Sequence, residues 1–358
     1  MKWPKGRLVL ALCLGTLMVQ ACTVERTVGR TEDGDWASPQ RAYRIPIALD
    51  TEPFEGLADV PVLLRLPKAV FGGVETSPDG ADLDLRSADT GEALAFEVDT
   101  WTSEGESLLW VHGLADGPDG ETEGAQPTVA HLYFGTTDDP GGASQSGERV
   151  FGDDYLAVHH LSAPPFEDSS PSGSALSDSG SSATEGLFGT ARRFGPGGAK
   201  MALSTAAFPD AAEPVTVCMW VRPSRSISGF QSIFGYGTPP RVLQEHAGEV
   251  WLRSGDDITI ARDALTVDTW THLCAAIQTD NIDLYTNGAL AAENSSDGYG
   301  AANGPASIGQ VMGFDSGFEG DIDEIRITGS FASAARVGQE YRAMVESWLV
   351  PQVLETRP

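Results

Sequence analysis

The sequence predicts an all-β chain: two antiparallel, jelly-roll-like β-sandwich domains in tandem, followed by a short C-terminal helix. Short apolar runs alternate with polar residues at a period of two, which is typical of strands with one buried face. The 41 Gly and 22 Pro among 358 residues supply the tight turns that many short strands require. A helical apolar period of useful length occurs only near the C-terminus. The length suits two domains of medium size.

Residues 1–21 are predicted to be an export signal peptide. Three cations precede an apolar stretch over residues 8–21, which is too short for a membrane span of about 20 apolar residues. Residues 19–22 (Val-Gln-Ala-Cys) resemble a bacterial lipobox, which implies that Cys22 is acylated and becomes the mature N-terminus. The alternative is an ordinary cleaved signal with an incidental cysteine. Because Thr23 stands where inner-membrane retention usually requires Asp, we expect an exported protein that is lipid-anchored in the outer membrane.

The mature chain is strongly acidic. Removing the three cations of residues 1–21 leaves 51 acids against 20 bases, a formal charge of −31. Long-range repulsion would oppose every encounter with nucleic acid or anionic lipid, so neither is an expected partner. We expect the protein to contact the membrane through its N-terminal lipid only. A hydrophobic share of 41%, arranged in periodic runs, argues against wholesale disorder.

The first sandwich is predicted over residues 41–154, after a lipidated tether at residues 22–40 that has no apolar period. Its first strand, residues 43–49, places apolar side chains on one face, and Pro46 predicts that this strand lies at a sheet edge. Turn sequences rich in Gly, Pro and Asp separate the later strands. These strands are expected at residues 60–66, 82–86, 94–101, 108–112 and 128–134.

Several blocks of the first domain, in order, resemble the DUF2341 family of bacterial domains of unknown function. The resemblance covers most of residues 41–161 and implies no activity. The matching blocks are residues 79–86 (DGADLDLR), 96–101 (FEVDTW), 109–112 (LWVH), 133–135 (YFG) and 158–161 (VHHL).

The second sandwich is predicted over residues 155–348. A Pro/Ser/Gly/Asp-rich run at residues 164–186 is expected to be a mobile surface loop of this domain rather than an interdomain linker. In the C-terminal helix Ser333 is the predicted N-cap, and residues 349–358 are expected to form a tail. Strands are expected at residues 215–221, 232–236, 250–253, 258–261 and 270–276, followed by a hairpin at 282–290 and a closing strand at 318–327.

The hairpin with its Tyr-x-Asn-Gly turn and the closing Gly-Asp-Ile-Asp-Glu-Ile-Arg-Ile strand resemble the laminin-G-like and pentraxin jelly rolls of the concanavalin A-like superfamily. The resemblance covers about residues 156–345. It implies non-catalytic binding of a glycan or of another component of the envelope or matrix. The pentraxin calcium site is not matched, because Val311 and Met312 follow Gly309-Gln310 where that family has ligands. No cofactor is therefore expected to be required, and calcium remains an open alternative.

Cysteine usage agrees with export. Cys13 leaves with the signal and Cys22 receives the lipid, so Cys218 and Cys274 remain in the folded part. Two cysteines in an exported chain predict one disulfide, with two buried free thiols as the alternative. The laminin-G-like resemblance adds that both positions correspond to the internal disulfide of pentraxins.

The closing strand also allows an enzymatic interpretation. Glu319, Asp321 and Glu324 fit the Glu-x-Asp-x-x-Glu pattern and resemble the catalytic strand of certain jelly-roll glucanases. Retaining hydrolysis requires a carboxylate nucleophile and a carboxylic acid, with the aspartate between them tuning both. A change in the parity of the apolar residues, between Ile322 and Ile325, predicts a β-bulge in this strand. The same residues are also the ordinary closing strand of non-catalytic relatives, so catalysis is the less favoured interpretation.

The remaining polar and aromatic candidates are expected to be structural. His159 and His160 lie in an apolar run, where packing is the expected role. The tryptophans on predicted strands are assigned to the core by default, although an exposed one would be able to stack on a sugar. The sequence thus favours an outer-membrane lipoprotein that binds a glycan, with a lipid-anchored polysaccharide hydrolase or lyase and an envelope assembly scaffold as alternatives.

Overall fold

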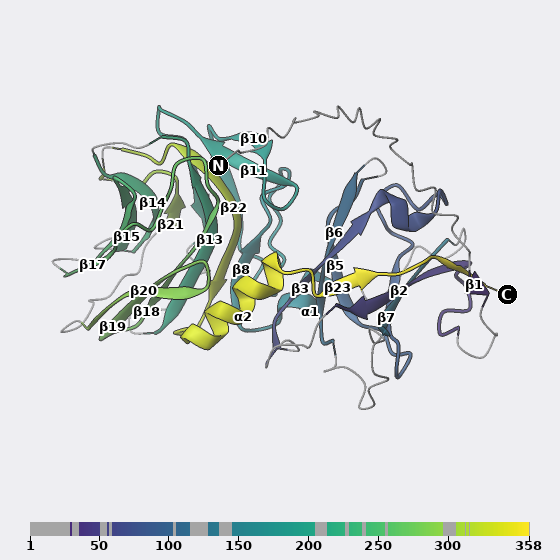
Figure 1. Ribbon diagram of the computed structural model, residues 1–358. Helices are drawn as coiled ribbons and strands as arrows, with labels where there is room; N and C mark the ends of the chain where they lie inside the picture. Colours follow the sequence, from purple (N-terminus) through teal and green to yellow (C-terminus); the bar gives the residue numbers. More distant parts are fainter. Residues whose placement is uncertain are drawn as a thin grey trace, which may run out of the picture.

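The computed structural model describes most of the chain, with the predicted signal peptide, Cys22 and most of the tether lying outside the described residues. Among the described residues, no helix is long and apolar enough to cross a membrane. The predicted all-β class is confirmed, because strands form nearly all of the regular structure (Figure 1). The described residues are 29–30, 36–50, 56, 59–102, 105–114, 128–135, 145–204, 213–225, 229–237, 241–254, 257–295, 306–311, 313–314 and 316–357.

The strands of the first sandwich form two sheets. Sheet A has the order β1 (Gly29–Arg30), β24 (Glu355–Thr356), β2 (Tyr43–Leu49), β7 (Thr128–Phe134) and β4 (Asp84–Ser87), with β23 (Leu349–Pro351) also paired to β2. Sheet B has the order β3 (Val62–Pro67), β6 (Glu106–His112) and β5 (Ala95–Thr100). The short helices η3 (Lys68–Phe71) and α1 (Gly147–Phe151) follow β3 and precede β8.

The second sandwich also has two sheets. Sheet C has the order β10 (Ser182–Glu185), β11 (Thr190–Phe194), β22 (Gly320–Thr328), β13 (Val215–Pro223), β18 (Thr271–Ile277), β19 (Asn281–Thr286) and β20 (Ala289–Ser295), with β8 (Tyr155–His159) also paired to β22. Sheet D has the order β17 (Asp257–Ala261), β16 (Glu249–Ser254), β15 (Arg241–His246), β14 (Gln231–Tyr236), β21 (Ala306–Ile308), β12 (Lys200–Leu203) and β9 (Leu176–Ser179).

The four sheets stack as layers in the order D, C, B and A, from left to right in Figure 1. One apolar core lies between sheets C and D and a second between sheets A and B. A third apolar cluster lies between sheets B and C, so both faces of sheet B are buried. Strand β6 shows this directly, because Leu109 and Val111 face sheet A while Leu108 and Trp110 face sheet C. The two sandwiches therefore share an extended buried contact.

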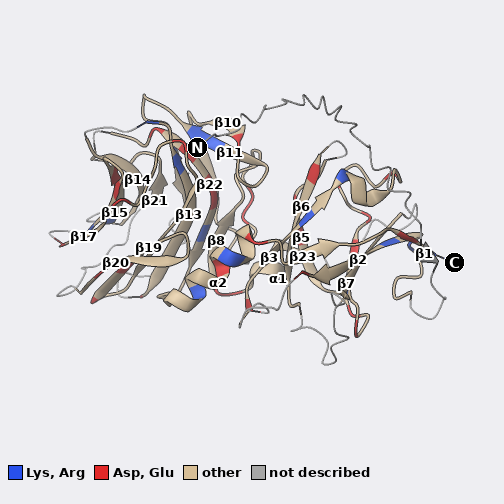
Figure 2. Ribbon diagram, in the orientation of Figure 1, with Lys and Arg blue, Asp and Glu red and all other residues tan. Residues whose placement is uncertain are grey.

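Helix α2 (Ala334–Val345) packs at the junction of the two sandwiches. Its N-terminus begins as predicted, since the Ser333 hydroxyl accepts a hydrogen bond from the Arg336 amide at 3.3 Å. Met344 lies in the cluster between sheets B and C, and the Arg336 side chain donates to the carbonyl oxygen of Asp59 in the first sandwich at 3.0 Å. Both signs of charge are visible along the helix in Figure 2, where Arg336 pairs with Glu340 at 2.7 Å.

The C-terminal residues are not merely a tail, which corrects the expectation for residues 349–358. They form β23 and β24, which pair with β2 and complete sheet A. Leu349 and Leu354 are buried in the core of the first sandwich, so burial of apolar area holds this segment in place.

Strand β2 lies inside sheet A, so the edge position predicted from Pro46 is wrong. One side of β2 pairs with β7, and the other side pairs with β24 at Tyr43 and Arg44 and with β23 from Ile47 onward. Pro46 falls in the gap between these two short partners. The missing N–H of proline therefore interrupts no ladder bond on that side, while its carbonyl accepts a hydrogen bond from the Gln352 amide at 2.8 Å.

Residues 164–186 are not a continuous mobile loop, which corrects a second expectation. They contain β9, which pairs with β12, and β10, which pairs with β11. The Asp168 carboxylate accepts hydrogen bonds from the backbone amides of Val158, Ser170 and Ser174 at 2.6–2.9 Å. Polar residues thus order this segment by satisfying its backbone, which a composition rich in Ser, Pro and Gly does not reveal.

The predicted disulfide and hairpin are both confirmed. Cys218 of β13 and Cys274 of β18 stand directly opposite each other in the ladder and are bonded, with their Cα atoms 4.1 Å apart. The hairpin between β19 and β20 turns at Asn287 and Gly288, whose φ angles of 48° and 78° suit a type I′ turn.

Candidate functional site

A β-bulge in β22 places two consecutive acids on the same face of sheet C. Cys218 pairs with Arg326 and Trp220 pairs with Asp323, so one residue of β13 opposes two residues of β22. The extra residue is accommodated at Glu324, whose φ of 53° lies in the left-handed region. The change in apolar parity thus predicted this bulge correctly. Asp323 and Glu324 both face sheet B, because Ile322 and Ile325 on either side of them point into the core between sheets C and D.

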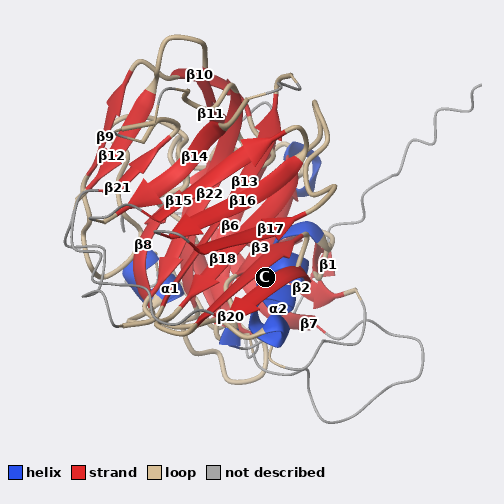
Figure 3. Ribbon diagram, turned by 90° about the vertical axis from the view of Figure 1, so that its left-hand side faces the viewer, coloured by secondary structure: helices blue, strands red, loops and turns tan. Residues whose placement is uncertain are grey.

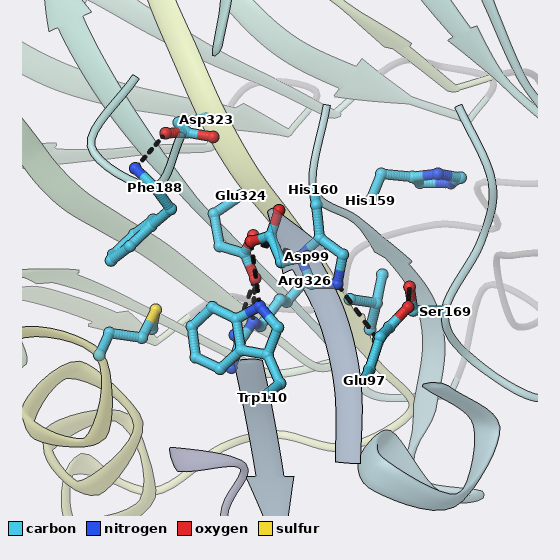
Figure 4. A network of polar contacts seen from close by, with 12 residues as sticks. Glu97, Asp99, Trp110, His159, His160, Ser169, Phe188, Asp323, Glu324 and Arg326 are labelled. Atoms are coloured by element: carbon cyan, nitrogen blue, oxygen red, sulfur yellow. Dashed lines mark hydrogen bonds and ion pairs between the residues drawn. The ribbon is translucent and has the colours of Figure 1, made fainter. Parts of the chain in front are cut away.

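Glu324 is the centre of a buried polar network between the two sandwiches (Figure 4). Its Oε2 atom lies 2.7 Å from Nδ1 of His160, which follows β8. Its Oε1 atom accepts hydrogen bonds from Nε and Nη2 of Arg326 at 2.9 and 2.7 Å. Leu161, the residue after His160, has a φ of 61°. The histidine and the glutamate thus meet where two non-glycine residues adopt left-handed backbone angles.

The first sandwich contributes two acids of β5 to this network. Glu97 Oε2 lies 3.3 Å from Nε2 of His160, and Glu97 Oε1 accepts a hydrogen bond from the Ser169 hydroxyl at 2.6 Å. Asp99 Oδ2 lies 3.8 Å from Nδ1 of His160 and accepts a hydrogen bond from Nε1 of Trp110 at 3.2 Å. The imidazole of His160 is therefore surrounded by three carboxylates from two domains.

Aromatic rings enclose the network. The rings of Trp110 and His160 stack with centroids 5.9 Å apart and planes 10° apart, and the Arg326 guanidinium carbon lies 4.3 Å from the Trp110 centroid. The side chains of Asp99 and Glu324 are each 1% exposed, whereas that of Glu97 is 19% exposed. The network is therefore closed on most sides and reaches solvent beside Glu97.

Burial and charge act in opposite directions on the network's pKa values. Burial raises the pKa of Asp99 to about 6, although His160 opposes this shift. Burial alone would lower the pKa of His160, but Glu324, Asp99 and Glu97 together raise it well above its ordinary value. Burial alone would raise the pKa of Glu324, whereas His160 and Arg326 hold it below its ordinary value. The site thus favours a positive charge at its centre.

The neighbouring acid, Asp323, has a different environment. Its Oδ2 atom accepts hydrogen bonds from the backbone amides of Leu187 and Phe188 at 2.8 and 3.0 Å. Burial raises its pKa well above the ordinary value, despite these two hydrogen bonds. Asp323 therefore anchors the turn before β11, and the described residues provide no cationic partner for it.

The three acids proposed for catalysis have separate partners. Glu319 pairs with Arg225, and Asp321 is held by Arg193 and by Arg222, each at 2.7 Å. Glu324 belongs to the buried network described above. Within the described part of the chain, no hydrogen bond or ion pair joins any two of these three carboxylates.

A second candidate site lies on the outward face of sheet D, which is turned toward the viewer in Figure 3. Leu243, Val250 and Leu252 point into the core, so the alternate residues Gln244 and Trp251, which pair across β15 and β16, point outward. We call this surface the aromatic face; its members are Phe230, Ser232, Gln244, His246, Trp251 and Arg253.

Three half-buried rings make up the platform of the aromatic face. Phe230 and His246 stack with centroids 4.4 Å apart, and Trp251 meets Phe230 edge-on at 5.1 Å. The Arg253 guanidinium carbon lies 5.4 Å from the Phe230 centroid. The Gln244 side chain is buried beside them, and its Oε1 atom has no hydrogen-bond partner among the described residues. A buried amide oxygen without a partner is costly unless a ligand or water satisfies it.

Sequence reasoning found part of these sites. Glu324 was singled out for catalysis, and Trp251 was assigned to the core by default. His159 packs as expected, with Nδ1 3.0 Å from the carbonyl oxygen of Glu167, but His160 joins the polar network. Glu97 and Asp99 were missed as site residues. Their only signal was that they alternate with Phe96 and Val98 on a predicted strand, and this alternation does not show what covers the polar face.

Comparison with known proteins agrees with the fold of the second sandwich. Residues 196–338 match the family described as the concanavalin A-like lectin/glucanases superfamily. No protein in a comparison with curated sequences matches the chain.

Solved structures with a similar arrangement include domain 4 of AbnA, a GH43 extracellular arabinanase from Geobacillus stearothermophilus, in complex with arabinotriose. It is 19% identical, with coverage of 52% of this chain and 98% of that one and a TM-score of 0.43. The ligand-binding domain of botulinum neurotoxin serotype D, in complex with N-acetylneuraminic acid, is 13% identical, with 53% and 50% coverage and a TM-score of 0.45. The chain spans about half the length of that toxin domain. From the family match and the observed strand order, the second sandwich contains a concanavalin A-like domain at residues 196–338.

Proposed function

We propose that this protein is a lipid-anchored protein of the bacterial outer membrane whose concanavalin A-like domain binds a glycan without catalysis. The observation that carries the proposal is the aromatic face of sheet D. There, Trp251 and its neighbouring rings lie half-buried on an outward sheet surface, beside the amide oxygen of Gln244, which has no hydrogen-bond partner among the described residues.

The chemistry of this surface suits a sugar. The C–H faces of a pyranose or furanose ring pack against aromatic rings, while its hydroxyls require hydrogen-bond partners at fixed positions. Trp251 and Phe230 supply the apolar surface. Gln244, as an amide that both donates and accepts, is able to bond a sugar hydroxyl. Arg253, which lies over Phe230, adds a donor at the edge of the platform.

The proposed anchor depends on the sequence alone. The lipobox-like residues 19–22 support lipidation of Cys22, and Thr23 supports sorting to the outer membrane. The DUF2341-like resemblance of the first sandwich supports the same bacterial, exported context. We propose that the first sandwich positions the glycan-binding domain, to which it is joined by the apolar cluster between sheets B and C.

A hydrolase or lyase is the less favoured function. A retaining glycosidase requires one carboxylate that is free to attack and one carboxylic acid that is free to donate a proton. Here Asp321 is held by two arginines, and Glu324 is buried against His160 and Arg326. Neither acid faces the aromatic face of sheet D. The proposed glycan-binding surface and these two acids therefore lie on different sheets.

The test is a glycan array probed with the intact chain in detergent, followed by titration of the best ligand. Trp251→Ala should weaken binding on the order of tenfold, because an aromatic contact contributes about 0.5–1.5 kcal/mol beyond the area that it buries. Trp270→Ala is the matched control, because Trp270 is also half-buried but packs under Arg222 near sheet C. Equal affinity of the Trp251→Ala protein and the unaltered protein would refute the site.

A further inference from the structure

We propose that Asp99, His160 and Glu324 form a binding site for a divalent transition-metal ion of the zinc type, between the two sandwiches. Each residue offers one ligand atom, and these atoms all lie within 4.8 Å of one another. Asp99 comes from sheet B, whereas His160 and Glu324 belong to the second sandwich. The proposal is independent of glycan binding, which we assign to the other side of the second sandwich.

The donor set selects the class of ion. One imidazole nitrogen and two carboxylate oxygens are typical zinc ligands, and three protein ligands leave the fourth position of a tetrahedral ion for water or another ligand. Calcium usually requires six to eight oxygen ligands, which these residues do not supply.

The distances between ligand atoms are compatible with a shared ion. Two atoms that each lie about 2.1 Å from a tetrahedral ion are roughly 3.4 Å apart. His160 Nδ1 lies 3.8 Å from Asp99 Oδ2 and 2.7 Å from Glu324 Oε2, so the two separations bracket that value. Coordination requires the Asp99 oxygen to move closer to Nδ1 of His160 and the Glu324 oxygen to move away from it.

Each ligand is oriented by a further hydrogen bond, as is usual around protein-bound metals. The second imidazole nitrogen, His160 Nε2, faces Glu97 at 3.3 Å, and Ser169 fixes that glutamate. Arg326 holds Glu324 through the oxygen that does not face His160. Trp110 donates to Asp99. The ring of His160 is thus held with Nδ1 directed toward the two ligand carboxylates.

The charge of the cluster also favours a dication. Glu97, Asp99 and Glu324 bring three carboxylates together, and Arg326 is the one permanently charged cation that pairs with them among the described residues. Buried carboxylates are costly unless they are paired or bind a metal. The partly exposed side chain of Glu97 marks the route by which an ion would enter.

The experiment uses the intact chain, stripped with a chelator and then dialysed against Zn²⁺, with bound metal measured by mass spectrometry of the elements and affinity by calorimetry. We expect one Zn²⁺ per chain. Asp99→Asn and His160→Gln should each weaken binding at least tenfold. His112→Gln is the matched control, because His112 lies at the end of β6 and takes no part in the network.

Circular dichroism must first show that the variants are folded. If either variant fails to fold, Co²⁺ bound to the unaltered chain replaces the comparison, because its visible absorption reports four-coordinate binding to a nitrogen and oxygen ligand set. Absence of stoichiometric Zn²⁺ on the unaltered chain would overturn the proposal, as would Zn²⁺ binding that is equally strong in folded Asp99→Asn. In either case glycan binding at the aromatic face is measured separately and is not affected.

Discussion

Removal of the disulfide between Cys218 and Cys274 should destabilise the protein by about 4 kcal/mol. The bond closes a loop with a sequence separation of 56 residues. In the chain-entropy description, a loop of this length costs the unfolded chain about 14 cal/mol/K, which is about 4 kcal/mol at 25 °C. Both cysteines are buried under helix α2 beside Tyr285 and Val337. The reduced native state therefore gains little conformational entropy that would offset the entropy gained by the unfolded chain.

The assay is urea unfolding followed by tryptophan fluorescence. Because the bond is buried, it is reduced in the unfolded protein, which is then refolded with reductant present. With a slope of about 3 kcal/mol/M or more, the midpoint should fall by roughly 1 M. The double variant Cys218→Ala/Cys274→Ala should show the low midpoint with or without reductant, which separates bond cleavage from other effects of the reagent. Ready alkylation of both thiols in native, unreduced protein would refute the reasoning, as would an unchanged midpoint.

Three further outcomes are expected. Cys22→Ser should abolish incorporation of radioactive palmitate and leave the protein unprocessed or soluble, and continued labelling would contradict lipidation. Burial lowers the pKa of His272 to about 3. The charge of Arg326 adds to this shift, and the charge of Glu324 opposes it. Below about pH 6.5, His272 is therefore protonated in the unfolded chain but stays neutral in the native chain. The free energy of unfolding thus decreases as the pH falls from about 6.5 toward 3, by at most about 1.4 kcal/mol per pH unit. Stability curves at several pH values should be flatter for His272→Gln than for the unaltered protein, and identical curves would contradict this assignment. Glu319→Gln should leave glycan affinity nearly unchanged, and no reducing ends should be released by the unaltered protein; release that disappears in this variant would establish the hydrolase instead.

Local patterns in the sequence predicted much of the second sandwich. The hairpin at Asn287 and Gly288 and the bulge near Glu324 depend on neighbouring residues or on strand parity, which the sequence displays directly. The cysteine pair was predictable by counting, because only two cysteines remain in the folded part of the chain. The first strand shows where such reasoning fails. Pro46 predicted a sheet edge, but two short C-terminal strands meet β2 on either side of the proline. A partner about 300 residues away leaves no local signal at Pro46.

The ordering of residues 164–186 was missed for a related reason. Composition predicted a loop because Ser, Pro and Gly bury little apolar area. The structure instead satisfies this backbone through the Asp168 carboxylate and through the edges of sheets C and D. Hydrogen bonds to the Asp168 carboxylate stabilise this segment, and such bonds cannot be predicted from the pattern of hydrophobic residues.

The buried network could not be predicted because alternation identifies a polar face but not what covers it. On β5, Phe96 faces sheet A while Glu97 and Asp99 face the other way, as they would on a strand exposed to solvent. On β22, the bulge turns Glu324 to the same side as Asp323. When sheets B and C pack together, these acids lose water, and each acid needs partners for its charge. His160 and Arg326, from the same sandwich as Glu324, bind that acid, and Trp110 of sheet B donates to Asp99. His160 also faces Glu97 and Asp99 across the contact between the two sandwiches. These cross-domain contacts of His160 are a property of the packed sandwiches, and they are expected to be lost if the domains are separated.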